Sequence, residues 1–257
     1  MSGLVLVTGA TGRLGKALLP RLAEAGFDVR GMSRSPRSGD EVRWTVADLT
    51  TGQGLAEALR GVDVVVHLAS APYKGKYTER VEVDGTRRLC EAARAADVGH
   101  LLYTSIIGAD QIPWGYFGTK VRTEEIVKSA QVPWSIVRAA QFHEFLDQAF
   151  GLAARTGLMI ADPGIKAQPV DVRDVADLLV RRIQEGPTSR TEDFGGPEVL
   201  ALDEAVRQWL DARRKRRPIV RVKLPGKLGA AFHGGHLATR STPTGTITWK
   251  RYLQERS

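Results

Sequence analysis

The chain has 257 residues, 42% of them hydrophobic and 26% charged, so it can bury a large core and is too apolar for a disordered protein. No apolar run reaches the roughly 20 residues of a membrane-spanning helix. The single cysteine, Cys90, excludes an internal disulfide and is expected to fill the core. The apolar residues 1–7 lack the features of a signal peptide and predict a buried strand in a cytoplasmic protein.

The net charge of +8 is concentrated in residues 207–227, which hold nine basic residues and one acidic residue. We interpret this segment as the solvated end of a helix that continues into a strand, because cations suit a helix C-terminus. A surface for an anionic substrate or for a partner is the alternative. Nucleic-acid binding is disfavoured because neither interleaved aromatic residues nor a binding motif accompanies the charge.

The first part of the chain predicts a regular alternation of strands and helices. Apolar runs predict strands at residues 4–8, 28–33, 43–47, 62–68, 101–105 and 134–138. Helices are predicted between them at residues 14–25, 55–59, 81–96 and 118–129. Six strands alternating with helices predict an α/β fold with a Rossmann-type, doubly wound parallel sheet.

Beyond residue 140 the alternation becomes irregular, with loop-rich stretches and a helix predicted over residues 202–213. We therefore expect a dinucleotide-binding core over residues 1–140. A smaller substrate-binding lobe, partly continuous with the core, is expected over residues 141–257. In such folds ligands bind at the carboxyl edge of the sheet, and we expect the lobe to cover that edge.

A glycine-rich loop follows the first predicted strand: residues 8–15 read Thr-Gly-Ala-Thr-Gly-Arg-Leu-Gly. In this position Gly9 permits a tight turn, Gly12 lets the backbone approach a pyrophosphate, and Gly15 lets helix and strand pack closely. The helix N-terminus then presents amides to the phosphates. The loop therefore predicts a dinucleotide site, with a glycine turn that binds no ligand as the alternative.

The Gly-x-x-Gly-x-x-Gly spacing resembles the short-chain dehydrogenase/reductase superfamily, in particular its atypical, NmrA-like NAD(P)-binding branch. Segments with the same resemblance follow in the same order at residues 66–70, 103–108, 116–120, 138–145 and 170–176. The resemblance covers most of the chain. It implies an NAD(P) cofactor and oxidoreductase chemistry.

The residues after the second strand indicate which dinucleotide is bound. Ser33 and Arg34 end this strand, and no acidic residue follows before Asp40. A carboxylate here would bond the ribose 2′-hydroxyl of NAD, whereas an arginine attracts the 2′-phosphate of NADP. We therefore expect NADP(H) as the cofactor. The alternative is that Arg34 is an ordinary surface residue. Asp48 and Leu49 resemble the family's adenine-contacting pair, unless Asp48 only caps the next turn.

The complete set of expected cofactor contacts combines the glycine loop, the ends of the second, third and fourth strands, and one lysine. Its members are Gly9, Thr11, Gly12, Arg13, Leu14, Ser33, Arg34, Asp48, Leu49, Leu68, Ala69, Ser70 and Lys120.

Residues 116–120, Tyr-Phe-Gly-Thr-Lys, provide the candidate catalytic groups. Tyr116 and Lys120 share one face if this segment is helical. A nearby ammonium stabilises phenolate, and the phenol could give a proton to a carbonyl oxygen as hydride arrives from NADPH. Ser105 is the expected third member. The alternatives are a packing role for Tyr116 and an ordinary strand-end role for Ser105.

Gln141, Phe142 and His143 follow the sixth strand, where the family lines its nicotinamide and substrate pocket. His143 and Glu144 are equally well explained as a structural pair. The remaining histidines have no metal-ligand spacing, so no metal site is expected.

The leading hypothesis is an NADPH-dependent reductase of a carbonyl, quinone or enone. A nucleotide-sugar epimerase-like enzyme and a non-catalytic NADP(H) sensor that regulates a partner are the alternatives. We expect a small-molecule substrate, no nucleic-acid or membrane partner, and a monomer or homodimer.

Overall fold

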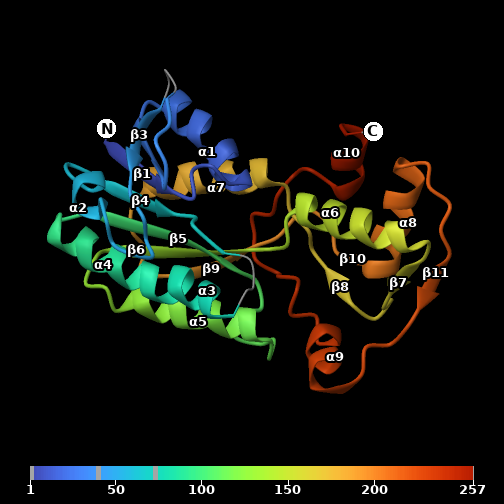
Figure 1. The fold of residues 1–257 in the computed structure, drawn as a ribbon. Coiled ribbons are helices and arrows are strands. Elements are labelled where there is room, and N and C mark those ends of the chain that lie inside the picture. The colour runs from blue at the N-terminus through green and yellow to red at the C-terminus, as the bar shows by residue number, and fades with distance from the viewer. Residues whose placement is uncertain (1–2, 39–41, 72–74, 257) are drawn as a thin grey trace. The chain divides into compact units, whose positions relative to one another are not determined.

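The computed structural model describes residues 3–38, 42–71 and 75–256. The chain folds into two compact units that are interleaved in sequence (Figure 1). The first unit consists of Met1–Ser105, Thr119–Val137 and Ala176–Glu192. The second unit consists of Ile106–Gly118, Arg138–Val175 and Asp193–Ser257. The glycine loop therefore belongs to the first unit, and the expected substrate residues belong to the second.

A seven-stranded sheet has the strand order β3-β2-β1-β4-β5-β6-β9. Its strands are β1 (Leu4–Thr8), β2 (Asp28–Ser33), β3 (Arg43–Val46), β4 (Val64–His67), β5 (His100–Ile106), β6 (Trp134–Ala139) and β9 (Thr191–Phe194). The registered pairs among the first five strands are all parallel. Chain order reverses between β1 and β4, which is where dinucleotides bind in doubly wound folds. The predicted fold class is confirmed.

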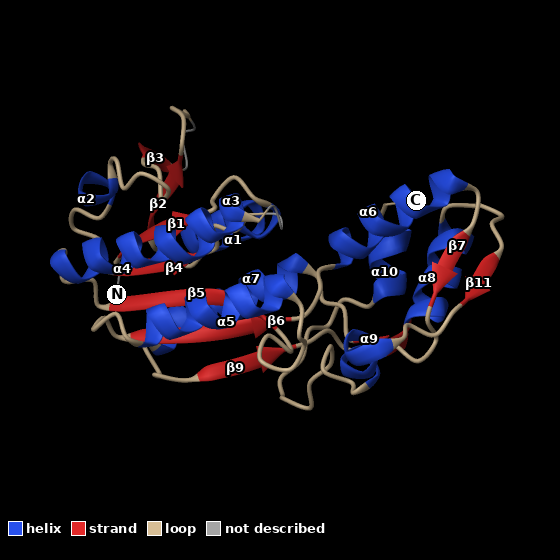
Figure 2. Ribbon diagram, turned by 60° about the horizontal axis from the view of Figure 1, so that its bottom comes forward, coloured by secondary structure: helices blue, strands red, loops and turns tan. Residues whose placement is uncertain are grey.

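The first two strands coincide with their predicted bounds. β1 is an apolar run, whereas β2 also contains Asp28 and Arg30. The seventh strand, β9, was not predicted, and it lies next to β6 at the edge of the sheet (Figure 2). Its sequence is Thr-Glu-Asp-Phe, and three of its four residues are partly exposed, so it has no apolar run.

Helices cover the sheet, with α1 on one side and α4 and α5 on the other (Figure 1). Their bounds are α1 (Arg13–Glu24), α2 (Leu55–Ala58), α3 (Lys76–Glu79), α4 (Gly85–Ala95), α5 (Gly115–Lys128) and α7 (Val172–Glu185). The helix expected over residues 81–96 already begins at Lys76, and a π turn over Arg80–Asp84 separates α3 from α4. Such turns interrupt the regular helical hydrogen bonds and are frequent at functional sites.

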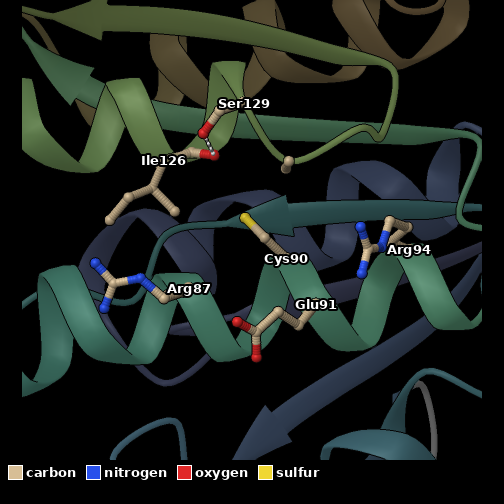
Figure 3. A pocket seen from close by; sticks show the side chains of 7 residues that line it. Arg87, Cys90, Glu91, Arg94, Ile126 and Ser129 are labelled. Carbon is tan, nitrogen blue, oxygen red and sulfur yellow. Dashed lines mark hydrogen bonds between the residues drawn. The ribbon is translucent and has the colours of Figure 1, made fainter.

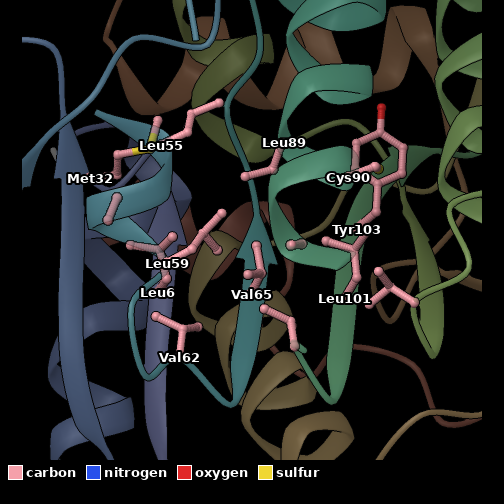
Figure 4. Packing of buried hydrophobic residues seen from close by; sticks show 14 of the residues in the cluster. Leu6, Met32, Leu55, Leu59, Val62, Val65, Leu89, Cys90, Leu101 and Tyr103 are labelled. Carbon is pink, nitrogen blue, oxygen red and sulfur yellow. The ribbon is translucent and has the colours of Figure 1, made fainter. Parts of the chain in front are cut away.

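The core of the first unit lies between the sheet and the helices, as Figure 4 shows. Leu6, Val65 and Leu101 come from adjacent strands, and Leu89 and Cys90 come from α4. Cys90 is buried, as predicted, and burial raises the pKa of its thiol to about 12. This cysteine therefore fills space as a small apolar residue.

The second unit has its own aromatic core. Its elements are α6 (His143–Ala153), a 3-10 turn (Ala154–Thr156), β7 (Met159–Ala161), β8 (Lys166–Ala167), β10 (Leu200–Ala201), α8 (Leu202–Ala212), β11 (Ile219–Arg221), α9 (Gly226–His233) and α10 (Trp249–Gln254). Trp249 stacks on Tyr252 at 5.4 Å and meets Phe150 edge-on. Asp147 accepts hydrogen bonds from Trp209 Nε1 at 2.6 Å and from the Arg213 guanidinium at 2.9 Å.

The basic segment is partly engaged in this packing. Arg213 pairs with Asp147, and Arg207 and Arg221 both pair with Asp203. The expected helix end is present, because α8 ends at Ala212. These contacts support the interpretation of the segment as a helix end that continues into a strand, here β11.

The described residues form neither a membrane-spanning helix nor a cluster of metal ligands. None of their helices combines the length and apolar character needed to cross a membrane. Within the same residues, no group of three or more His, Cys, Asp or Glu side chains is arranged to hold a metal ion.

The packing of α1 gives a first prediction. A Cβ atom on Gly15 would lie 2.5 Å from the Gly9 carbonyl oxygen and 2.6 Å from that of Ala10, so the backbone would have to move. Gly15→Ala should lower the free energy of unfolding by about 1–3 kcal/mol, measured by urea denaturation.

The matched control is Gly118→Ala in α5, where an added Cβ meets nothing within 4 Å. It should be neutral or stabilising by up to about 1 kcal/mol, as expected for replacing a helical glycine. Equal effects of the two substitutions would show that the Gly15 contact does not constrain the loop.

Candidate functional site

The glycine loop forms a close-fitting cradle at the start of α1. Gly9 has a positive φ of +65°, and a Cβ there would lie 2.7 Å from backbone atoms of Leu68 and Ala69. Gly12 is the N-cap of α1, and no side chain caps it. A loop that lacks Cβ atoms at Gly9, Gly12 and Gly15 and opens a helix suits the close approach of a pyrophosphate. The cradle therefore fits a dinucleotide.

A buried histidine fixes the base of this loop. The Thr8 hydroxyl accepts hydrogen bonds from the amides of Leu68 and Ala69, both at 3.2 Å, so its own hydrogen is available for His67 Nδ1 at 2.7 Å. The other ring nitrogen, Nε2, lies 2.9 Å from the Thr86 hydroxyl, which donates to the Glu82 carbonyl. This order of donors assigns His67 as a neutral ring protonated on Nε2.

The expected adenosine contacts lie after β2 and β3. Arg34 is exposed, and its guanidinium donates to the Tyr77 hydroxyl at 3.2 Å. Ser33 is buried and bonds within its own loop to Ser35. Asp48 accepts from the amide and the hydroxyl of Thr50, at 2.7 and 2.8 Å. That geometry is the turn cap considered as the alternative for Asp48.

Further predicted contacts are distributed between the core and the loop surface. Leu14 and Leu49 are buried in the core, whereas Thr11 and Arg13 are exposed at the start of α1. Asp40 lies outside the described residues.

Lys120 is held by a buried carboxylate that the sequence analysis did not single out. Its Nζ lies 3.0 Å from Glu82 Oε2 and 3.2 Å from the Tyr103 hydroxyl. The side chains of Lys120 and Glu82 are 4% and 0% exposed. Glu82 Oε1 accepts from the Ser70 hydroxyl at 2.5 Å and from the Ala71 amide at 3.1 Å. Glu82 therefore joins Lys120 to the segment that follows β4.

Strand β5 and helix α5 face each other with matched spacing. Tyr103 and Ser105 lie two residues apart on β5, and Lys120 and Glu124 lie one turn apart on α5. Tyr103 contacts Lys120, and the Ser105 hydroxyl donates to Glu124 Oε1 at 2.6 Å. Ser105 is thus buried on the face that α5 covers.

The remaining expected residues belong to the second unit. Tyr116 lies in the first turn of α5, one turn before Lys120, and its ring meets Phe117 edge-on at 6.4 Å. Phe142 precedes α6 as its N-cap. Gln141 Oε1 is a buried acceptor with no hydrogen-bond partner among the described residues.

His143 is fully buried in the aromatic core of the second unit. Its ring lies 5.2 Å from that of Tyr252, Nε2 is 3.2 Å from the Pro169 carbonyl oxygen, and Nδ1 is 3.7 Å from Asp171. This placement matches the structural role considered as the alternative. The carboxylate beside the ring belongs to Asp171. Burial raises the pKa of the Glu144 carboxyl, which follows His143 in the chain.

Sequence reasoning missed Glu82 and His67 because each looks ordinary in its own segment. Glu82 sits in Arg-Val-Glu-Val-Asp, and His67 ends an apolar strand. The one signal in the sequence was that Glu82 lies between two apolar residues. That signal becomes informative only once Lys120 is known to be its partner.

A shallow hollow of about 230 Å³ lies between α4 and α5, away from the predicted site residues (Figure 3). Its lining residues are Arg87, Cys90, Glu91, Arg94, Ile126, Ser129 and Ala130. It shares no residue with the glycine cradle or with the Lys120–Glu82 pair.

Comparison with known proteins shows the family of this chain. The family described as NAD(P)H-binding matches residues 9–186, a range that includes the three glycines of the loop, Glu82 and Lys120. The chain belongs to this family. The resemblance to the atypical, NmrA-like branch of the short-chain dehydrogenases/reductases is thereby confirmed.

Several curated relatives are named as oxidoreductases. A (4-alkanoyl-5-oxo-2,5-dihydrofuran-3-yl)methyl phosphate reductase of Streptomyces griseus is 32% identical, over 80% of this chain and 72% of its own. The 40 kDa subunit of mitochondrial NADH-ubiquinone oxidoreductase of Neurospora crassa is 30% identical, over 86% of this chain. The chain spans 63% of that subunit. A ceramide reductase of Caulobacter vibrioides is 32% identical, over 69% and 60% of the two chains.

Solved structures share the fold at lower identity. An NADPH-dependent quinone oxidoreductase of Escherichia coli, solved with NADPH, has a TM-score of 0.82 and 20% identity, covering 98% of this chain and 99% of its own. A nucleoside-diphosphate-sugar epimerase of Staphylococcus aureus has a TM-score of 0.79 and 18% identity, covering 99% and 100%. Reductases and epimerases thus share this architecture.

The hydrogen bonds of His67 predict its titration. Burial, with a smaller contribution from Lys120 and against the attraction of Glu82, lowers the pKa of His67 to about 4. Between pH 4 and the ordinary histidine pKa of 6.5, this ring binds a proton in the unfolded chain but not in the folded protein. The free energy of unfolding should therefore decline as the pH falls from about 6.5 to 4. The loss should be on the order of 3 kcal/mol for this ring.

Burial also lowers the pKa of His100 to about 4. The titration of His67 must therefore be followed on its own NMR signal, apart from that of His100. His67 should remain neutral and protonated on Nε2 above about pH 5. A His67 ring that titrates near pH 6.5 would disprove the assigned hydrogen-bond order.

Proposed function

We propose that this protein is an NADPH-dependent reductase of a small carbonyl, quinone or enone. The observation that carries the proposal is the combination of the glycine cradle with Arg34 at the end of β2. The cradle accommodates a pyrophosphate, and the described part of the loop after β2, residues 34–38, contains no carboxylate. An arginine in this position favours a 2′-phosphate.

Each part of the cofactor and substrate would be bound by a different group of the chain. The amides at the start of α1 bind the pyrophosphate, Arg34 binds the 2′-phosphate, and Lys120 binds the nicotinamide ribose. Bound NADPH supplies a hydride. Tyr116, one turn before Lys120 on α5, donates the proton that the reduced oxygen requires.

The named relatives support this assignment by class. Two are called reductases, and the Escherichia coli structure contains NADPH. Gln141 offers a buried carbonyl oxygen, with no partner among the described residues, that a donor group on a substrate could satisfy.

Cofactor preference provides a direct test. Arg34→Ala should weaken NADPH binding by roughly 10–100-fold, because a charge-assisted bond to the phosphate is lost. NADH, which has no 2′-phosphate, should be affected much less. Both dissociation constants can be measured by nucleotide fluorescence.

Arg43→Ala is the matched control for this test. Arg43 is also an exposed arginine, but it begins β3 and so lies at the opposite edge of the parallel sheet. It should leave both affinities unchanged. Equal losses for NADPH and NADH in Arg34→Ala would refute the phosphate role.

The role of Tyr116 is tested with a panel of quinones, ketones and enones, following the loss of NADPH absorbance. Tyr116→Phe should reduce turnover by roughly 10²–10⁴-fold and leave NADPH affinity unchanged, because only the proton donor is removed. Unchanged turnover would disprove the proton-donor assignment. Tight NADPH binding without turnover of any substrate in the panel would favour the sensor alternative.

A further inference from the structure

Glu82 carries a charge in the interior of the first unit. It lies in the π turn between α3 and α4, and its side chain is 0% exposed. A buried carboxylate is costly unless it is paired and hydrogen-bonded. The partners of Glu82 therefore indicate what this residue does.

The carboxylate binds two separate parts of the expected cofactor site. Its Oε2 accepts from Lys120 on α5 at 3.0 Å. Its Oε1 accepts from Ser70 and from the amide of Ala71, which follow β4. Burial tends to raise the pKa of Glu82, but the Lys120 ammonium and these hydrogen bonds outweigh it and hold the pKa below its ordinary value.

The backbone of the same residue reaches the glycine loop. The Glu82 carbonyl oxygen accepts from the hydroxyls of Thr86 and Thr123. Thr86 is hydrogen-bonded to His67, and His67 is hydrogen-bonded to Thr8, the residue before Gly9. One residue in the π turn thus connects the base of the phosphate loop, the segment after β4 and the lysine of α5.

Stability alone is a poor explanation for this arrangement. Replacing a buried ion pair by apolar residues of similar size is often neutral or stabilising, whereas removing one partner is strongly destabilising. What the pair provides is a fixed location and a fixed charge state for the ammonium group. Both side chains are almost wholly enclosed, so each charge depends on the other.

We propose that Glu82 is a positioning residue of the cofactor site, holding Lys120 charged and in place without itself contacting NADPH. This inference rests on the proposed function, in which Lys120 binds the nicotinamide ribose. It extends that function by naming a residue, outside the expected contacts, on which NADPH binding depends.

The groups around Lys120 define how a variant should titrate. Among the described residues, Glu82 faces it from the π turn, Tyr103 from β5 and Ser70 from the segment after β4, with His67 close by on β4. The buried carboxylate of Glu124 lies one turn further along α5 and accepts from Ser105. In Glu82→Gln the ammonium loses the carboxylate that lies 3.0 Å away, and burial then favours the uncharged amine. An uncharged Lys120 would donate more weakly to a ribose hydroxyl.

The first measurement uses the protein without cofactor. In Glu82→Gln the folded state should bind fewer protons at Lys120 than the unfolded chain does, so stability should rise with pH in the alkaline range. The gap in melting temperature between wild type and Glu82→Gln should narrow from pH 6.5 to pH ~9.5, below the ordinary lysine pKa of about 10.4. Adding Lys120→Met to the variant should abolish this narrowing.

The second measurement is NADPH affinity by fluorescence over the same pH range. The dissociation constant of the wild type should stay nearly constant, whereas that of Glu82→Gln should be raised throughout and increase by up to about tenfold per pH unit as Lys120 loses its proton. Glu79→Gln is the matched control. Glu79 ends α3 and pairs with Arg122 at a partly exposed position, so both profiles should match the wild type.

A loss of stability and affinity in Glu82→Gln that does not vary with pH would overturn the proposal and leave Glu82 a packing residue. If Glu82→Gln does not fold but Glu82→Gln/Lys120→Met does, the uncompensated ammonium is the cause, which supports the proposal. If neither folds, Glu82 is needed for the structure itself and the proposal fails. A wild type that binds no NADPH would overturn the proposed function, and the role of Glu82 with it.

Discussion

The close approach of α1 to the ends of β1 and β4 is the constraint on which the rest of the site depends. Only a loop without Cβ atoms at Gly9 and Gly15 allows the helix N-terminus to lie this near two strands. The Thr8 hydroxyl then satisfies two amides of the segment after β4, so the loop and that segment are fixed together. A dinucleotide pyrophosphate fits where side chains are excluded and amides are available.

The same constraint explains why polar groups are buried beneath the loop. Backbone amides brought this close to a strand end need acceptors, and the Thr8 hydroxyl oxygen provides one while its hydrogen goes to His67 Nδ1. His67 Nε2 donates to Thr86, whose hydroxyl donates to the backbone carbonyl of Glu82. The carboxylate of the same residue meets Lys120.

The predictable parts of the structure are those specified by local pattern. An apolar run located β1, and glycine spacing located the phosphate loop. The edge strand β9 was missed because its pairing with the sheet, not its composition, makes it a strand. Glu82 was missed for a related reason: its partner lies 38 residues away, and only the fold brings them together. Ser105 was named from the sequence, but its contact with Glu124 was not, because only the fold brings α5 to this strand.

The Lys120–Glu82 pair also changes how the tyrosine chemistry should be understood. The sequence suggested that the ammonium stabilises phenolate, which supposes an uncompensated positive charge. With a carboxylate 3.0 Å away, the pair is nearly neutral when viewed from a distance, and its effect on a neighbouring phenol is correspondingly small. In the proposed reducing direction this is no handicap, because the donor must carry its proton before hydride transfer. In the proposed function the lysine contributes by binding and orienting the cofactor, and the buried Glu82 carboxylate fixes its charge and its location.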